Sequence, residues 1–309
     1  MTAVGPFGCA RYAWLTLGSG ATLQTVYLEN PGLGYFCSSL DLGYPTVRAV
    51  TNNRPGQHGV DDRTQFYADR AVTVDIEAVE AASSTKLDAI AGLFAPFMNV
   101  AARPVLHYVL DRPGAAERTL TVRPVTMTAP VNGYAARSLH LQFVAADPLP
   151  VDPTWRNTTA WSGSGTIAGR SYPLTFPRTY PAGSGGPGAT VGTIVTVGDV
   201  PVAPLLYIYG PITRPHAWIA NTDLSGTFDI YTLPGLTISA GHSLVIDTRA
   251  KTAYLDNDPT QPAMASIDWT STSWPLVTPS PNTGNLRLAG SSTSGITQVV
   301  AWWQDVYLS

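Results

Sequence analysis

Short apolar runs separated by tight turns fill much of the second half of the chain. The run 205–209 (L-L-Y-I-Y) is β-branched and aromatic, and a Gly-Pro pair at 210–211 ends it, which is typical of a strand with a sharp stop. Residues 244–248 (L-V-I-D-T) form a second run, and a polar turn leads from it into 252–255. A strand, a polar turn and a strand within about a dozen residues predict a hairpin. We therefore expect a β-sandwich that presents loops.

The first half of the chain shows a similar pattern with clearer alternation. Between 71 and 78, valine and isoleucine alternate with threonine and acidic residues, which predicts a strand with one buried face. Further strands are predicted at 12–17, 23–28, 106–110, 118–122 and 138–145, with a glycine-rich turn at 18–20.

One segment has the period of a helix instead. Ser83 or Ser84 can cap its start. Apolar side chains then recur at spacings of three and four, at Leu87, Ile90, Phe94 and Phe97. Such a stripe is expected to pack on the sheet that the neighbouring strands form.

A proline-rich linker is expected to divide the chain into two domains. Residues 146–153 (A-D-P-L-P-V-D-P) contain three prolines, which stiffen the chain and prevent sheet pairing. Beyond residue 152 there is no glutamate, and seven of the eight tryptophans lie there. A chain of 309 residues is long enough for two cores. We predict an N-terminal domain at 1–150 and a C-terminal β-sandwich at 151–309.

Composition excludes several classes of protein. Charged residues make up 13% of the chain, and the net charge of −3 comes with no basic stripe, which argues against nucleic acid as a ligand. No apolar run reaches the ~18 residues that would predict membrane insertion. The N-terminus lacks the pattern of a secretory signal, so we expect assembly in the cytoplasm of a cell. Cys9 and Cys37 are expected to be buried thiols, with a bridge between them as the alternative.

No catalytic pattern stands out, and we predict no enzyme, no cofactor and no metal site. The glycine-rich stretches lack the spacing of a phosphate loop, and no GxSxG elbow precedes a helix. The histidines have no zinc-ligand spacing, and His107 and His140 fall within predicted strands. Asp256 and Asp258 offer oxygen ligands for calcium, but both are also ordinary turn residues.

A polar stretch at 52–64 is the strongest candidate for an interface. It contains two glycines and a proline, and long loops in compact domains are often functional. Its candidate contact residues are Arg54, Gln57, His58, Asp61, Asp62 and Arg63.

The tryptophans of the second half allow two interpretations. Each buries some 150–250 Å² when it fills a core or an interface, and that is the simpler reading. Flat rings can also stack on sugars, and Trp218, Trp269 and Trp274 are the preferred members of such a platform because they flank loops. Trp302 and Trp303 are adjacent on a strand, so only one of them can face inward.

Several motifs together resemble the distal tail protein (Dit) family of long-tailed bacteriophages. In the second half they are Y-P-L-T-F-P-R at 172–178, A-P-L at 203–205 leading to G-P at 210–211, A-G-H-S-L-V-I-D-T at 240–248 and V-V-A-W-W at 299–303. In the first half they are R-P-G-Q-H-G at 54–59, A-D-R-A-V-T-V at 68–74, and 139–146 followed by Asp147-Pro148. The resemblance covers nearly the whole chain.

The resemblance implies a mainly β fold, with a split-barrel-like N-terminal domain carrying one helix and a galectin-like or carbohydrate-module-like C-terminal β-sandwich. It implies a virion protein of the tail tip that forms a ring, commonly a hexamer, between the tail tube and the tail-tip hub and adsorption apparatus. The partners would be further copies of the chain, the tail tube protein and the hub protein, with the tape measure protein and host surface polysaccharide as further candidates.

The ring would need two unlike patches on each subunit. The stretch 52–64 and the strand 71–78 are the segments we expect to supply them. A carbohydrate-binding module that contacts host cell-wall sugars is the alternative function.

Overall fold

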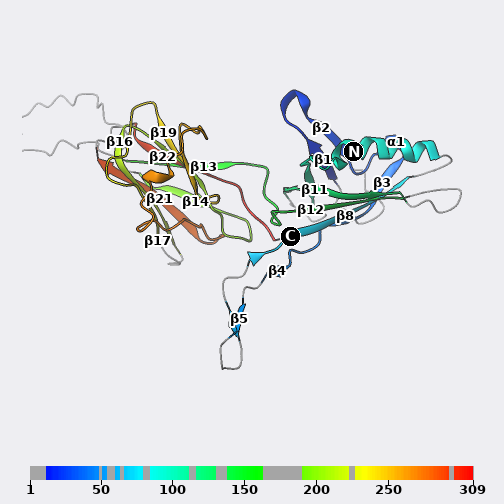
Figure 1. The fold of residues 1–309 in the computed structure, drawn as a ribbon, viewed down its shortest axis with the longest axis horizontal. Coiled ribbons are helices and arrows are strands. Elements are labelled where there is room, and N and C mark those ends of the chain that lie inside the picture. Colours follow the sequence, from blue (N-terminus) through cyan, green and yellow to red (C-terminus); the bar gives the residue numbers. More distant parts are fainter. Residues whose placement is uncertain are drawn as a thin grey trace, which may run out of the picture. The chain divides into compact units, whose positions relative to one another are not determined.

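The chain divides into two compact units (Figure 1). Unit 1 comprises Met1–Pro153 together with Tyr307–Ser309, and unit 2 comprises Thr154–Val306. The last residues thus belong to unit 1, whereas the sequence placed them in the second domain. The computed structural model describes residues 12–48, 51–53, 60–62, 66–78, 84–110, 116–129, 138–162, 190–222, 227–291 and 296–308.

Antiparallel sheets dominate both units, which confirms the mainly β prediction. Unit 1 has two four-stranded sheets. The first runs β10 (Glu117–Thr121), β9 (Val105–Val109), β1 (Tyr12–Leu17) and β2 (Gln24–Tyr27). The second runs β11 (Arg123–Thr128), β12 (Ser138–Ala145), β8 (Arg70–Ala78) and β3 (Tyr35–Asp41). Two small pairs join β4 (Val47–Arg48) to β7 (Phe66–Tyr67) and β5 (Thr51–Asn53) to β6 (Val60–Asp62).

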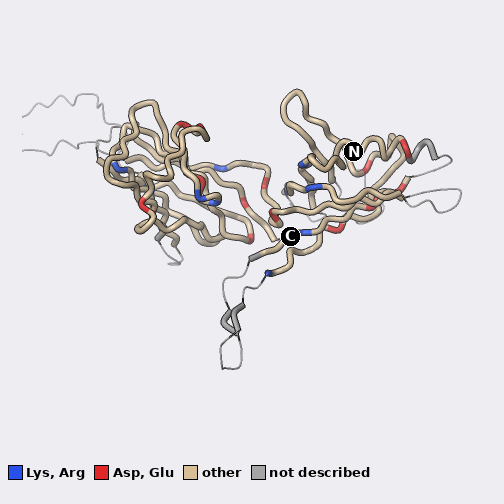
Figure 2. Tube along the Cα trace, in the orientation of Figure 1, with Lys and Arg blue, Asp and Glu red and all other residues tan. Residues whose placement is uncertain are grey.

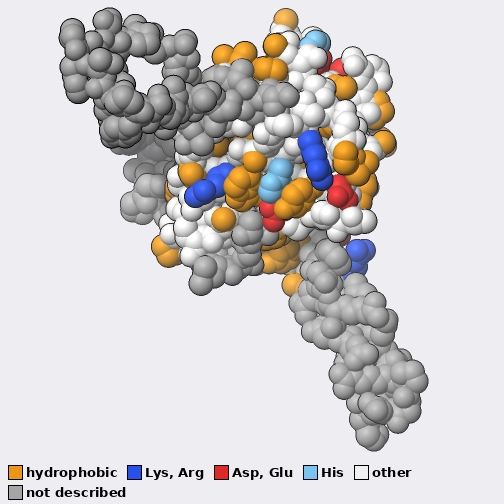
Figure 3. Space-filling model, turned by 90° about the vertical axis from the view of Figure 1, so that its left-hand side faces the viewer, with side chains coloured by type: hydrophobic (Ala, Val, Ile, Leu, Met, Phe, Trp, Pro, Cys, Tyr) orange, Lys and Arg blue, Asp and Glu red, His pale blue; other side chains and the backbone are white. Residues whose placement is uncertain are grey.

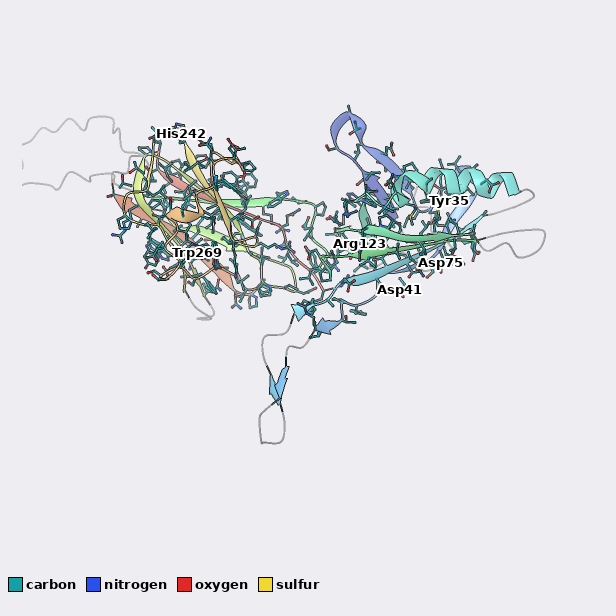
Figure 4. All side chains as sticks on the ribbon, viewed as in Figure 1. Tyr35, Asp41, Asp75, Arg123, His242 and Trp269 are labelled. Atoms are coloured by element: carbon teal, nitrogen blue, oxygen red, sulfur yellow. The ribbon has the colours of Figure 1, made fainter. Side chains whose placement is uncertain are left out.

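One hydrophobic core lies between the two sheets of unit 1 and takes in the helix. In β8 the valines and the isoleucine are buried and alternate with more exposed polar residues, as the sequence predicted. The helix α1 (Ser84–Phe94) continues into η3 (Ala95–Met98), and Ile90, Phe94 and Phe97 are buried. Phe94 meets Tyr35 of β3 edge to face, with ring centroids 6.1 Å apart, and Figure 4 labels Tyr35 on the side of the sheet that faces α1. The predicted apolar stripe therefore packs on the sheet.

Short turns and two further 3-10 helices complete unit 1. The turn between β1 and β2 contains Gly18, at φ +88°, and leads through η1 (Gly20–Thr22); η2 (Pro31–Leu33) precedes β3. Cys37 of β3 is buried, and Cys9 lies outside the described residues.

Unit 2 is a sandwich of two sheets around a second core. One sheet runs β13 (Arg156–Trp161), β22 (Gln298–Trp303), β15 (Leu205–Tyr209), β19 (Ser243–Asp247) and β20 (Thr252–Leu255). The other runs β14 (Gly192–Val195), β21 (Thr283–Ser291), β16 (Ile212–Asn221) and β17 (Thr227–Tyr231), with β18 (Thr237–Ile238) paired to β16. A 3-10 helix, η4 (Met264–Ser266), lies in the connection that follows β20.

The hairpin predicted near residue 250 is present as β19 and β20. Its turn is held by the carboxylate of Asp247, whose Oδ1 accepts hydrogen bonds from the backbone amides of Arg249 (2.9 Å) and Ala250 (2.8 Å). Lys251 follows in the left-handed region at φ +56°. An Asp side chain that bonds its own backbone two residues on is the usual way in which such a turn is fixed.

The C-terminal residues pack into unit 1. The amide of Tyr307 donates to the carbonyl of Pro150 at 2.9 Å, and the guanidinium of Arg118 lies 4.0 Å from the centre of the Tyr307 ring. The buried side chain of Arg70 donates to the carbonyl of Leu308, and burial lowers the pKa of this arginine. The chain therefore leaves unit 1 after Pro153 and re-enters it at Tyr307.

Charged residues are sparse and scattered along the described parts of both units (Figure 2). The face of the molecule in Figure 3 likewise mixes basic, acidic, histidine and hydrophobic side chains. In the part of the chain that the structure describes, no helix has both the length and the apolar character needed to cross a membrane.

Candidate functional site

Most of the residues predicted for a ring interface lie outside the described part of the chain. This holds for Arg54, Gln57, His58 and Arg63. Asp61 and Asp62 belong to β6, where Asp61 pairs with Asn52 and Asp62 with Thr51 of β5. The stretch 52–64 is thus not a loop throughout, because Asn52 and Asn53 pair with Asp61 and Val60 in a two-stranded ladder.

The strand predicted at 71–78 cannot offer a free edge. It is β8, and it pairs with β12 on one side and with β3 on the other. A central strand has its backbone donors and acceptors bound already, so only the outer strands of a sheet can pair with another chain. The sequence showed that 71–78 is a strand, but its place in the sheet depends on pairings that the pattern does not encode.

Among the strands that the structure describes, two others of unit 1 lie at the edges of their sheets and carry or adjoin exposed apolar side chains. Strand β2 is the outermost strand of the first sheet. Leu23, which precedes β2, is 52% exposed, and Tyr27, its last residue, is 55% exposed. Strand β11 ends the second sheet, and its Val125 and Met127 are 51% and 36% exposed. Natural proteins usually protect such edges with charges or cover them. These two edges are therefore candidate contact surfaces.

The structure brings together two of the three tryptophans preferred for a sugar platform. The ring centroids of Trp269 and Trp274 are 5.6 Å apart and their planes are tilted by 56°. Trp269 is 53% exposed, whereas Trp274 packs against the core. Trp218 of β16 stacks on His216, at 4.7 Å. A sugar platform made of these three side chains stays a prediction.

The prediction that only one of the adjacent tryptophans on the last strand faces inward is confirmed. Trp303 is 5% exposed and belongs to the core of unit 2. Trp302 lies on the outer face, where it lines a groove of 420 Å³ together with Trp155, Leu205, Tyr207 and Tyr209. The alternation within 205–209 puts Leu205, Tyr207 and Tyr209 on one face of a strand. Because both faces of this run are apolar, the sequence does not indicate which face points away from the core.

Each of the four histidines that the structure describes lies against a carboxylate. Their ring nitrogens are 2.7 Å (His107–Glu117), 2.5 Å (His140–Asp75), 2.9 Å (His216–Asp229) and 2.7 Å (His242–Asp256) from the carboxylate oxygens. The first three pairs join neighbouring strands, which confirms that His107 and His140 are sheet-face residues. Cross-strand pairs of this kind stabilise a sheet and need no catalytic role.

The aspartates considered for calcium are held by hydrogen bonds within the chain. Asp256 accepts from the His242 ring and from the amide of Ser243, at 2.7 and 2.8 Å. Asp258 accepts from the amide and hydroxyl of Thr260, at 2.9 and 2.8 Å. Within the described ranges, no group of three or more His, Cys, Asp or Glu side chains is arranged to hold a metal ion. Figure 4 labels His242 and Trp269 at separate places on unit 2.

The hydrogen bonds to Asp256 predict part of the acid sensitivity of unit 2. Those from His242 and Ser243 hold the pKa of this carboxyl below its ordinary value of 3.8. A carboxyl group whose pKa is lower in the folded chain than in the unfolded chain stabilises the fold at pH values above its unfolded-state pKa. This contribution is lost as the pH falls through its folded-state pKa. Asp256→Asn, which suits the left-handed backbone at this residue, should therefore lose less stability than the wild type between about pH 5 and pH 2. Urea unfolding midpoints across that range measure the difference, and parallel pH profiles for the two proteins would contradict the assignment.

Comparison with known proteins points to one fold. No protein-family model and no curated protein matches the sequence. Among solved structures, the crystal structure of the Dit (gp 19.1) protein of phage SPP1 matches at 13% identity with a TM-score of 0.59, over 96% of this chain and 99% of that chain. It is described as a paradigm of the hub adsorption apparatus in phages that infect Gram-positive bacteria. Chains of the phage p2 baseplate in its activated conformation, with calcium or strontium, match at 10% and 11% identity with TM-scores of 0.43 and 0.44, over 94% of this chain and 97% of theirs.

The match to the SPP1 protein spans both units rather than a single sheet or sandwich. It confirms at the level of the fold the resemblance drawn from the sequence motifs. Over 96% of its length, the chain matches the fold of a bacteriophage distal tail protein.

Proposed function

We propose that this chain is a structural protein of a phage tail tip, where six copies form a ring that joins the tail tube to the hub and adsorption apparatus. The observation that carries the proposal is the whole-length match to the SPP1 distal tail protein, which covers 96% of this chain and 99% of that one. The ring, the tube protein and the hub protein as neighbours, and a place in the virion after assembly in the host cytoplasm are parts of this proposal.

The open edges of unit 1 support ring formation. A closed ring needs two different surfaces on each subunit, so that one surface of each copy meets the other surface of the next. Strands β2 and β11 end different sheets and expose different apolar side chains. In the proposed ring, β2 of one subunit lies against β11 of its neighbour. The contact would bury the backbone groups of both edge strands together with their exposed apolar side chains. The stretch 52–64 remains a proposed second contact.

The first test is the mass of the purified chain in solution, measured by light scattering over a range of concentrations. Six times 32.8 kDa, or 197 kDa, is the mass expected for the ring. A mass of 32.8 kDa at every concentration, with purified tail tube protein present as well as absent, would contradict the proposal.

Charged substitutions at the two edges test the contact itself. Val125→Glu with Met127→Glu should reduce the mass to that of a monomer, because each glutamate would be desolvated at the interface without a partner. Leu23→Lys with Tyr27→Lys should do the same from the other side. The four changes combined in one chain should restore the ring, since each acidic edge would then meet a basic edge.

The control is Val100→Glu, which puts the same charge on a side chain of unit 1 that is 87% exposed and lies in neither edge. This variant should keep the mass of the wild type. If the two edge variants also keep it, the ring uses another surface.

A further inference from the structure

The outer face of one sheet of unit 2 carries more aromatic surface than a solvated sheet face normally does. The central strand β15 turns Leu205, Tyr207 and Tyr209 outward, while Leu206 and Ile208 between them fill the core. Strand β22 adds Trp302 directly opposite Leu205. Antiparallel sheets that face water on one side usually alternate apolar and polar residues, so an outward aromatic run indicates a binding surface.

These side chains line a groove of 420 Å³. Trp155, which precedes β13 in the chain, also lines the groove, and it is 53% exposed. The rings of Tyr207 and Tyr209 are nearly parallel, with an interplanar angle of 17° and centroids 6.3 Å apart. The two tyrosine rings thus share one orientation, unlike the tilted pair of Trp269 and Trp274. Its volume falls in the range of about 300–1,000 Å³ that small-ligand sites occupy.

Polar side chains stand beside these rings on the same face of the sheet. Asn157 of β13 pairs with Trp302, and Asp247 of β19 pairs with Leu205. Gln298 of β22 and Ser243 of β19 lie on either side of Tyr209. Because neighbouring strands are about 4.8 Å apart, amide, carboxylate and hydroxyl groups lie within reach of anything stacked on the rings. The amides of Asn157 and Gln298, and the carboxylate oxygen of Asp247 that does not hold the hairpin turn, can form hydrogen bonds with hydroxyl groups.

We propose that this groove binds a neutral saccharide, with the rings of Trp302, Tyr207 and Tyr209 stacking on the apolar faces of sugar rings and the flanking polar side chains binding sugar hydroxyls. The proposal concerns unit 2 alone and does not depend on the ring of subunits. It moves sugar recognition from Trp218, Trp269 and Trp274 to the opposite sheet of the sandwich.

The dimensions favour a sugar over a protein partner. A standard protein interface engages about 20–30 residues on each side, whereas five residues line this groove. None of the five is charged, so the groove offers no counter-charge to an ionic ligand. Asp247 beside it repels anions. A polyanionic glycopolymer is therefore expected to bind less well than a neutral one.

The test is affinity electrophoresis of the full-length chain in native gels that contain soluble glucan, galactan or mannan, with a poly(glycerol phosphate) gel for comparison. At least one neutral polymer should retard the wild type. Trp302→Ala and Tyr207→Ala should each weaken the binding at least tenfold, because each removes one stacking surface. Leu276→Ala, which truncates an exposed apolar side chain elsewhere in unit 2, should leave the retardation unchanged.

Three results would overturn the proposal. They are no retardation by any neutral polymer, retardation by the polyanion alone, and retardation that survives Trp302→Ala but disappears in Trp269→Ala. Calorimetry of each variant shows whether unit 2 is folded. If Trp302→Ala does not fold, Trp155→Ala carries the test, since that exposed side chain lies before β13 and outside the core.

Discussion

Replacing Trp303 by alanine is expected to destabilise unit 2 by about 3–5 kcal/mol, the usual cost of truncating a buried tryptophan. Trp303 is 5% exposed and lies in the core on β22, which pairs with β13 on one side and with β15 on the other. The cavity would therefore open beneath an inner strand of the sheet. In calorimetry the transition of unit 2 should move down by on the order of 10 °C for a unit of this size.

The adjacent tryptophan provides a matched control. Trp302→Ala removes the same side chain from the outer face of the same strand, so it should cost only about 1 kcal/mol. Trp303→Phe should cost less than Trp303→Ala, because it keeps most of the packing and removes a buried indole N–H that has no hydrogen-bond partner in the structure. Equal destabilisation by Trp302→Ala and Trp303→Ala would contradict the assignment of the two faces.

Local features of the fold could be predicted because they depend on neighbouring residues. The strand β8 follows from a strict period of two, and α1 follows from apolar residues at spacings of three and four. The hairpin of β19 and β20 follows from a polar turn between two apolar runs. In each case the residues that decide the conformation lie within about a dozen positions of one another.

Features that depend on pairing between distant strands could not be predicted. The sequence offered β8 as an interface strand, but β3 and β12 occupy both of its edges. Strand β11 was not predicted, although its edge position makes it the better candidate. The aromatic groove joins Trp155 to β15 and β22, three segments that are distant in the sequence, so no local pattern could bring them together.

Arg156→Ala is expected to destabilise unit 2 by about 3–5 kcal/mol, because it removes a partner of a buried charge. The carboxylate of Asp305 is completely buried, and its Oδ2 forms an ion pair with Nη2 of Arg156 at 2.8 Å. Its Oδ1 accepts from the amide of Val197 at 3.1 Å. Asp305 thus connects the start of β13 to the segment after β14, which belongs to the other sheet. Denaturant unfolding of the variant measures the loss.

A second substitution separates the buried charge from lost packing. Adding Asp305→Asn to Arg156→Ala should recover part of the stability, because a neutral amide can still accept from Val197 and costs less to bury than a carboxylate that has lost its ion pair with Arg156. Lost packing alone would not be recovered by the second substitution. If the double variant is no more stable than Arg156→Ala, the ion pair does not account for the loss.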